Sequence, residues 1–170
     1  MKTVIVCYSL TGNTAWAARR IAGALDADLL ELRSRKAYPD RGFRKFLRGG
    51  RSAMAAECPP LEPYEFDAGR YDRVILATPL WAGRITPPLR TFLTEQRAAL
   101  SGKRFAAVIC CSGGKDDRAF AQLRELLGTE LDASLRLVDP KDRPSPDNDS
   151  RLEEFCRILN PDHHPKEETP

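Results

Sequence analysis

Short apolar runs and helical patterns alternate along most of this chain, and this alternation restricts the fold more than any other feature. Runs of strand length occupy residues 3–8, 28–33, 73–78, 104–111 and 134–138. Apolar residues at helical spacing occupy 14–25, 86–98, 117–128 and 149–159. Runs such as Val74 to Ala77 are apolar at every position, which is typical of a sheet buried on both faces. The sequence therefore predicts an α/β fold, a doubly wound five-stranded parallel sheet.

The length of the chain fits one domain. Its 170 residues are enough for a single core, and we expect residues 1–159 to form it, followed by a flexible, proline-rich tail at 160–170. The stretch at about 34–71 is too long for a plain connection, and we interpret it as an insertion. Phe43, Phe46 and Leu47 predict a short helical face there, which we expect Gly49-Gly50 to interrupt.

The basic character of the chain is confined to part of that insertion. Residues 33–51 hold eight Lys or Arg and one Asp, a net charge of +7, whereas the whole chain carries +3. Such a segment could attract an acidic partner. The Gly-Gly pair and the scarcity of interleaved aromatics argue against a dedicated nucleic-acid surface.

The sequence gives no sign of export or of membrane insertion. The apolar run after Lys2 is too short for a secretory signal, and no stretch approaches the roughly 20 apolar residues of a membrane span. The five cysteines form neither a Cys-x-x-Cys pair nor a zinc spacing. We therefore expect a cytoplasmic protein without a metal site.

A polar loop joins the first predicted strand to the first predicted helix. It reads Ser9-Leu10-Thr11-Gly12-Asn13-Thr14, and hydroxyls with free backbone N–H groups at a helix N-terminus form a phosphate pocket. No basic residue lies between Ser9 and Ala18, so we expect these groups to hold the phosphate without Lys or Arg. The spacing matches neither a nucleotide-triphosphate P-loop nor Gly-x-Gly-x-x-Gly.

Two further loops end at the same edge of the predicted sheet. In a parallel sheet ligands bind at the carboxyl ends of the strands, so these loops face the same crevice as Ser9 to Thr14. After the third strand comes Thr78-Pro79-Leu80-Trp81-Ala82-Gly83, and after the fourth comes Ser112-Gly113-Gly114. A phosphate pocket beside a large aromatic on a stiff loop fits flavin mononucleotide, FMN.

These three loops resemble the flavodoxin family. Ser9 to Thr14 matches the pattern Ser/Thr-x-Thr-Gly-x-Thr, Ala77 to Gly83 is similar to the loop beside the isoalloxazine ring, and Cys111 to Gly114 is similar to the loop on its other side. The resemblance implies strand order 2-1-3-4-5 and bound FMN. It further implies that Ser9, Thr11, Asn13 and Thr14 hold the phosphate. Pro79, Leu80 and Trp81 would contact the ring, and Ser112, Gly113 and Gly114 would supply backbone contacts.

Three functions fit these observations. The first is a redox protein that transfers electrons through FMN to a partner protein or a small molecule. The second is an FMN-dependent NAD(P)H:quinone-type oxidoreductase, because residues 112–118 lack the aromatic that stacks on the flavin in many flavodoxins and so could leave a face open. The third is a module that binds an acidic partner through residues 33–51. No side chain is an obvious catalytic acid or base.

Overall fold

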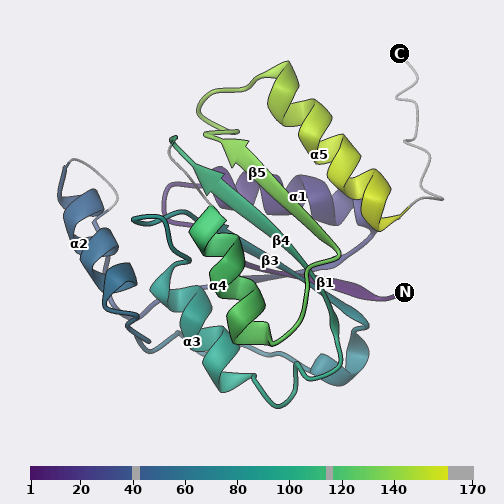
Figure 1. Ribbon diagram of the computed structural model, residues 1–170, viewed down its shortest axis with the longest axis horizontal. Coiled ribbons are helices and arrows are strands. Elements are labelled where there is room, and N and C mark those ends of the chain that lie inside the picture. Colours follow the sequence, from purple (N-terminus) through teal and green to yellow (C-terminus); the bar gives the residue numbers. More distant parts are fainter. Residues whose placement is uncertain (40–42, 114–116, 161–170) are drawn as a thin grey trace.

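The structure is a parallel sheet with helices on both faces (Figure 1). The computed structural model describes residues 1–39, 43–113 and 117–160. Its strands are β1 (Thr3–Tyr8), β2 (Asp28–Leu32), β3 (Arg73–Pro79), β4 (Arg104–Cys111) and β5 (Ala133–Val138). Its α-helices are α1 (Asn13–Leu25), α2 (Phe43–Met54), α3 (Pro87–Glu95), α4 (Asp117–Leu127) and α5 (Pro146–Leu159), and a short 3-10 helix spans Ala68–Arg70.

All strand pairs are parallel, and the strand order is β2-β1-β3-β4-β5. The predicted fold class and strand order are thus confirmed. Because the chain winds one way from β1 to β2 and the other way from β3 to β5, the winding reverses between β1 and β3. A ligand site is expected at the carboxyl ends of these two strands.

Two apolar layers hold the helices against the sheet. On one face Ile75 packs with Ile21 of α1 and Phe155 of α5. On the other face, under α3 and α4, Leu76 packs with Phe92 of α3. These side chains are at most 2% exposed, and each such burial contributes roughly 1.5–3 kcal/mol. The two layers fix the strand ends from which the loops of the candidate site extend.

The predicted helices are confirmed, with two shifted ends. Helix α5 begins at Pro146 instead of residue 149, because the Ser145 hydroxyl accepts a hydrogen bond from the N–H of Asn148 and caps the first turn. Helix α3 ends at Glu95 instead of residue 98. The carbonyl of Gln96 then accepts from the N–H of Leu100, so the chain turns there toward β4.

The two ends of the insertion, residues 34–71, lie close together beside the sheet. Arg35 N–H donates to the Pro60 carbonyl (2.9 Å) and Glu62 N–H to the Arg33 carbonyl (2.8 Å), so the two ends of the segment pair with each other. Helix α2 lies between these ends, apart from the sheet in Figure 1.

The expected interruption at Gly49-Gly50 was wrong. Helix α2 runs through both glycines to Met54, and both are buried. A Cβ on Gly49 would lie 3.1 Å from the Trp81 ring, and one on Gly50 would lie 3.5 Å from the Ala82 Cβ. The glycines therefore let the helix approach the loop after β3 instead of ending it, since the packing gained offsets their low helix propensity.

The tail that we expected at residues 160–170 lies, except for Asn160, outside the described residues. Within the described part of the chain, no helix is both long enough and apolar enough to cross a membrane.

Candidate functional site

The loop after β1 leaves the N-terminus of α1 open to a ligand. Gly12 is the N-cap residue with φ 95°, and its N–H donates to the Ser9 hydroxyl at 3.2 Å. A positive φ of this size favours glycine. In the described structure no side chain caps the first turn of α1. The free N–H groups of that turn, with Thr11 and the buried Thr14, form the donor set that a phosphate requires.

The Asn13 side chain has a task that the sequence did not indicate. Its Oδ1 accepts from the N–H groups of Lys141 (2.9 Å) and Asp142 (3.2 Å). Its Nδ2 donates to Asp142 Oδ2 at 2.7 Å and lies 3.4 Å from Thr11 Oγ1. The side-chain amide thus connects the β5–α5 loop to the N-terminus of α1. Because these bonds occupy the amide, we propose that Asn13 contacts a phosphate through its backbone N–H.

The loop after β3 is a tight hairpin that presents Trp81. Trp81 and Arg84 exchange two backbone hydrogen bonds of 3.0 Å. Between them Ala82 and Gly83 have φ of 51° and 74°, the conformation of a type I′ turn. At the base of the loop the hydroxyls of Thr78 and Thr86 lie 2.9 Å apart and are fully buried. Thr78 therefore stabilises the base of the loop and does not line the pocket.

Two aromatic residues pack against the Trp81 ring. Tyr38 approaches it edge-on with ring centroids 4.9 Å apart, and Tyr8 does so at 5.9 Å. Gly49 of α2 is also close to the ring. Tyr38 is itself held by Ser52 of α2, whose hydroxyl lies 3.1 Å from the phenol oxygen and donates to Glu57 at 2.6 Å. The insertion therefore fixes the position of Trp81.

The loop after β4 contacts the loop after β5. Ser112 donates a hydrogen bond to Asp139 Oδ1 at 2.7 Å, and Gly113 has φ 128°. Gly114, the third residue predicted here, lies outside the described residues. Cys110 reaches the same space from the end of β4. Burial raises the pKa of its thiol to about 12, so Cys110 lines the pocket as a neutral thiol.

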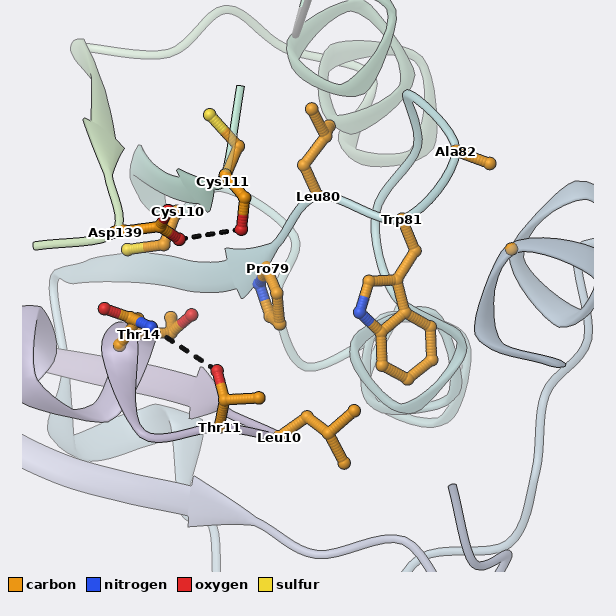
Figure 2. A pocket seen from close by; sticks show the side chains of 13 residues that line it. Leu10, Thr11, Thr14, Pro79, Leu80, Trp81, Ala82, Cys110, Cys111 and Asp139 are labelled. Atoms are coloured by element: carbon orange, nitrogen blue, oxygen red, sulfur yellow. Dashed lines mark hydrogen bonds between the residues drawn. The ribbon is translucent and has the colours of Figure 1, made fainter. Parts of the chain in front are cut away.

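These loops surround an open pocket of about 100 Å³ at the carboxyl ends of the strands (Figure 2). The residues that line it are Leu10, Thr11, Asn13, Thr14, Gly50, Pro79, Leu80, Trp81, Ala82, Cys110, Cys111, Ser112 and Asp139. One end, which we call the phosphate end, is formed by Thr11, Asn13 and Thr14. The other, the ring end, is formed by Leu10, Leu80 and Trp81 with Gly50. A polar end beside an apolar end suits a flat molecule that carries a phosphate.

Most predicted site residues come together in this pocket. Of the others, Ser9, Gly12, Thr78, Gly83 and Gly113 shape the three loops without lining it. Four lining residues were not predicted: Gly50, Cys110, Cys111 and Asp139. Asp139 directly follows the predicted strand 134–138, so the loop after the fifth strand carried a usable signal. Nothing in the sequence near Gly50 indicates its place beside Trp81.

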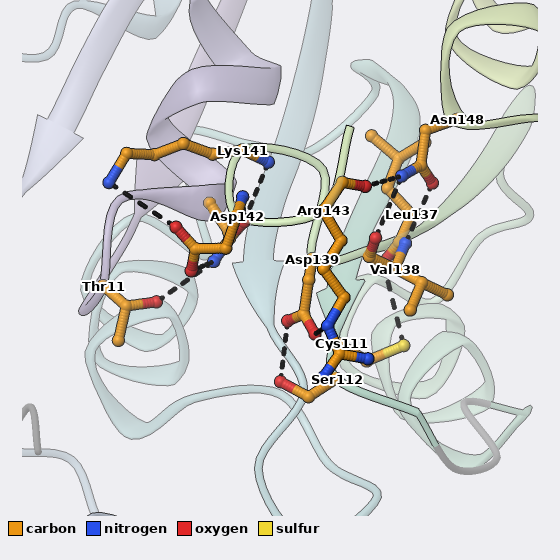
Figure 3. Close-up of polar contacts among 11 residues, drawn as sticks. Thr11, Cys111, Ser112, Leu137, Val138, Asp139, Lys141, Asp142, Arg143 and Asn148 are labelled. Carbon is orange, nitrogen blue, oxygen red and sulfur yellow. Dashed lines mark hydrogen bonds and ion pairs between the residues drawn. The ribbon is translucent and has the colours of Figure 1, made fainter. Parts of the chain in front are cut away.

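Charged side chains gather where the β5–α5 loop meets the phosphate end (Figure 3). Asp139 accepts from Ser112 and pairs with Arg143 at 3.7 Å. Asp142 accepts from Asn13 and pairs with Lys141 at 3.8 Å. The Lys141 ammonium lies 3.2 Å from the position that a Cβ on Gly12 would occupy. The fold therefore adds a cation beside a loop that has none in the sequence.

The comparison with protein families matches the chain to a known domain family. The model of a family described as a flavodoxin domain matches residues 49–139, more than half of the chain. The chain belongs to the flavodoxin family. The matched range of this flavodoxin domain includes the loops after β3 and β4, but it begins after Ser9 to Thr14, so the phosphate end rests on the motif and the geometry. A search of functionally curated proteins finds no match.

Solved structures share the flavodoxin fold of this chain. A flavoprotein from Lactobacillus acidophilus NCFM in complex with FMN has a TM-score of 0.71 at 19% identity, over 91% of this chain and 97% of that one. Streptococcus pneumoniae TIGR4 flavodoxin has a TM-score of 0.56 at 20% identity, over 94% and 97%. Two-electron reduced Megasphaera elsdenii flavodoxin has a TM-score of 0.56 at 18% identity, over 92% and 96%. These structures share the fold of the chain, and the first of them contains FMN.

Proposed function

We propose that this chain binds FMN in the strand-end pocket and transfers electrons through it to a redox partner, either a protein or a small molecule. The observation that carries the proposal is the uncapped N-terminus of α1 beside Thr11 and Thr14, facing the same pocket as Trp81. Bound FMN would supply the electron transfer itself.

The residues of the chain would bind and orient the cofactor. Backbone N–H groups of α1 with the hydroxyls of Thr11 and Thr14 would hold the phosphate, and Ser9 would keep Gly12 in its turn. Leu10, Leu80 and Trp81 would exclude water from the apolar ring. The backbone at Ser112 and Gly113 would approach the ring from the β4 side.

The insertion contributes to this site, which supports reading residues 1–159 as one domain with 34–71 as part of its binding apparatus. Helix α2 lines the ring end through Gly50 and fixes Trp81. All five cysteines are free thiols, which favours a reducing compartment such as the cytoplasm as the place of action.

Titration with FMN tests the proposal. The apoprotein should quench the fluorescence of added FMN to a one-to-one end point, and protein purified from cells should be yellow and release FMN on denaturation. Riboflavin, which has the ring and the ribityl chain but no phosphate, serves as the matched ligand and should bind more weakly. Failure to bind added FMN would overturn the proposal.

A reductase is the second candidate, because residues 112–118 contain no aromatic side chain to cover the flavin. Such an enzyme would take hydride from NADH or NADPH and reduce a quinone. Steady-state assays with either nucleotide and a quinone separate the two functions. Turnover by the isolated, FMN-loaded protein would establish the reductase. If there is no turnover, electron transfer to a redox partner remains the function.

The binding of an acidic partner by residues 33–51 stays a prediction. Arg33, Arg35 and Arg51 are exposed, whereas Lys36 pairs with Glu57. Residues 40–42 lie outside the described part of the chain. If this segment steers a redox partner, their association rate should fall steeply with added salt.

A further inference from the structure

We propose that Lys141, in the loop between β5 and α5, binds the phosphate of the ligand and makes this site selective for the phosphorylated flavin. The inference rests on the proposed binding of FMN and adds a residue to it. The phosphate loop itself contains no Lys or Arg, so the tertiary structure has to supply any cation.

Lys141 reaches the phosphate end from the far end of the chain. Its Cδ, Cε and Nζ lie 3.5, 3.7 and 3.2 Å from the position that a Cβ on Gly12 would occupy, so the side chain lies across the loop. Lys141 is outside the pocket wall, next to the wall residues Thr11 and Asn13. A lysine carries a point charge on a flexible stem, so its ammonium can move from this rim position toward an anion at the helix N-terminus.

The backbone of Lys141 is held in place by Asn13. Asn13 Oδ1 accepts hydrogen bonds from the N–H groups of Lys141 and Asp142 at 2.9 and 3.2 Å. Asn13 is 7% exposed and is the first residue of α1. The same residue therefore begins the helix that would receive the phosphate and anchors the loop that carries the cation.

The charges around the phosphate end favour a cation at this position. A phosphate monoester carries about −1.5 to −2 charges at neutral pH, while a helix N-terminus offers about +0.5. Asp139 and Asp142 stand on the same loop as Lys141 and would repel the phosphate. Both cations of this loop have an acidic partner, Arg143 at 3.7 Å from Asp139 and Lys141 at 3.8 Å from Asp142. In the described structure it is the Lys141 side chain that lies next to Gly12.

A purely structural role for Lys141 makes a different prediction. Lys141 could serve only to neutralise Asp142, whose Oδ1 lies 3.8 Å from its ammonium. That pair is long and about half exposed, and such pairs contribute little to stability. Asp142 already accepts a 2.7 Å hydrogen bond from Asn13. In that case replacing Lys141 would leave the discrimination between phosphorylated and unphosphorylated ligand unchanged.

The test compares FMN with riboflavin, which differs by the phosphate alone. We expect Lys141→Met to weaken FMN binding about 10-fold, the value of one charge-assisted contact, and to leave riboflavin binding unchanged. Lys141→Arg should keep most of the FMN affinity. Lys103→Met is the matched control, because Lys103 directly precedes β4 at the amino ends of the strands, away from the pocket. This variant should change neither affinity.

Each outcome is decisive for one of the two proposals. If the unaltered protein binds FMN and Lys141→Met keeps the same ratio of FMN to riboflavin affinity, Lys141 is not a phosphate ligand, although the proposed function stands. An equal loss of both affinities overturns the inference as well. If the unaltered protein binds neither flavin, the proposed function itself fails, and the inference fails with it.

A double-mutant cycle tests the positioning role of Asn13. Asn13→Ala should lower the ratio of FMN to riboflavin affinity, because it releases the loop that carries Lys141. In the Asn13→Ala, Lys141→Met double variant the two losses should not add, since both remove the same contact. Fully additive losses would show that Asn13 acts independently of Lys141.

Discussion

The two ends of the pocket are built in different ways. The phosphate end, Thr11, Asn13 and Thr14, comes from one short loop whose conformation is set by a turn and by the start of one helix. The ring end combines the hairpin after β3 with Tyr38 and α2, which are far apart in the sequence. Local backbone geometry therefore governs the first, and packing between distant segments governs the second. Substitutions at the two ends should differ in what they change.

The largest effect is expected at the ring end, from Trp81→Ala. The ring packs on Tyr8, Tyr38 and α2, so its loss should lower the free energy of unfolding by about 3 kcal/mol. FMN and riboflavin affinities should fall by the same factor, because both carry the ring. Urea denaturation and fluorescence titration measure the two effects.

Trp16→Ala is the matched control for Trp81, because Trp16 lies on α1 against Arg20 and outside the pocket. It should leave both affinities unchanged. If Trp81→Ala instead weakened the binding of FMN and not that of riboflavin, the division of the pocket into a ring end and a phosphate end would be wrong.

Gly49→Leu should cost about 2 kcal/mol in unfolding free energy, because a Cβ there meets the Trp81 ring at 3.1 Å and overpacking forces the helix or the ring to move. Gly23→Leu provides the comparison, since Gly23 is also helical and has no atom within 4 Å of its Cβ position. That variant should be neutral or slightly stabilising. Equal urea midpoints for the two variants would contradict the close packing of α2 on Trp81.

Gly12→Ala tests the phosphate end, with an expected cost of about 1 kcal/mol from its φ of 95°. The methyl group would also meet the Lys141 ammonium, so FMN affinity should fall while riboflavin affinity does not. Gly128→Ala shares the strain, at φ 67°, but has an open Cβ position. An identical loss of FMN affinity in both variants would show that backbone strain in the fold, and not contact with Lys141, causes the effect.

The smallest effect is expected from Glu57→Gln, in the network that supports Tyr38. Hydrogen bonds from Lys36 and then Ser52 hold the pKa of Glu57 below its ordinary value of 4.5. Because the folded pKa is the lower one, the carboxylate stabilises the fold above pH 4.5, and this stabilisation is lost as the pH falls through the lowered pKa. Urea midpoints should therefore differ between the variant and the unaltered protein at pH 7 and converge at acidic pH. A constant difference would exclude the ionised form as the cause.

The sequence determined the strands, the helices and the phosphate loop, because each depends on contacts within a few residues. Apolar runs such as Val74 to Ala77 predict buried strands wherever they pack, and the turn at Gly12 needs only Ser9 and a glycine. The Trp81 loop was also predicted, since proline and glycine restrict it locally.

Only the tertiary structure decided what surrounds those loops. Gly49-Gly50 looked like a helix interruption because local propensity disfavours glycine, yet packing on Trp81 and Ala82 outweighed that preference. Asn13 looked like a phosphate ligand, but its amide anchors a loop more than a hundred residues away. Lys141 lies beside the phosphate end because parallel strands bring their carboxyl ends to one edge of the sheet, and a side-chain partner so distant in the chain leaves no pattern in the sequence.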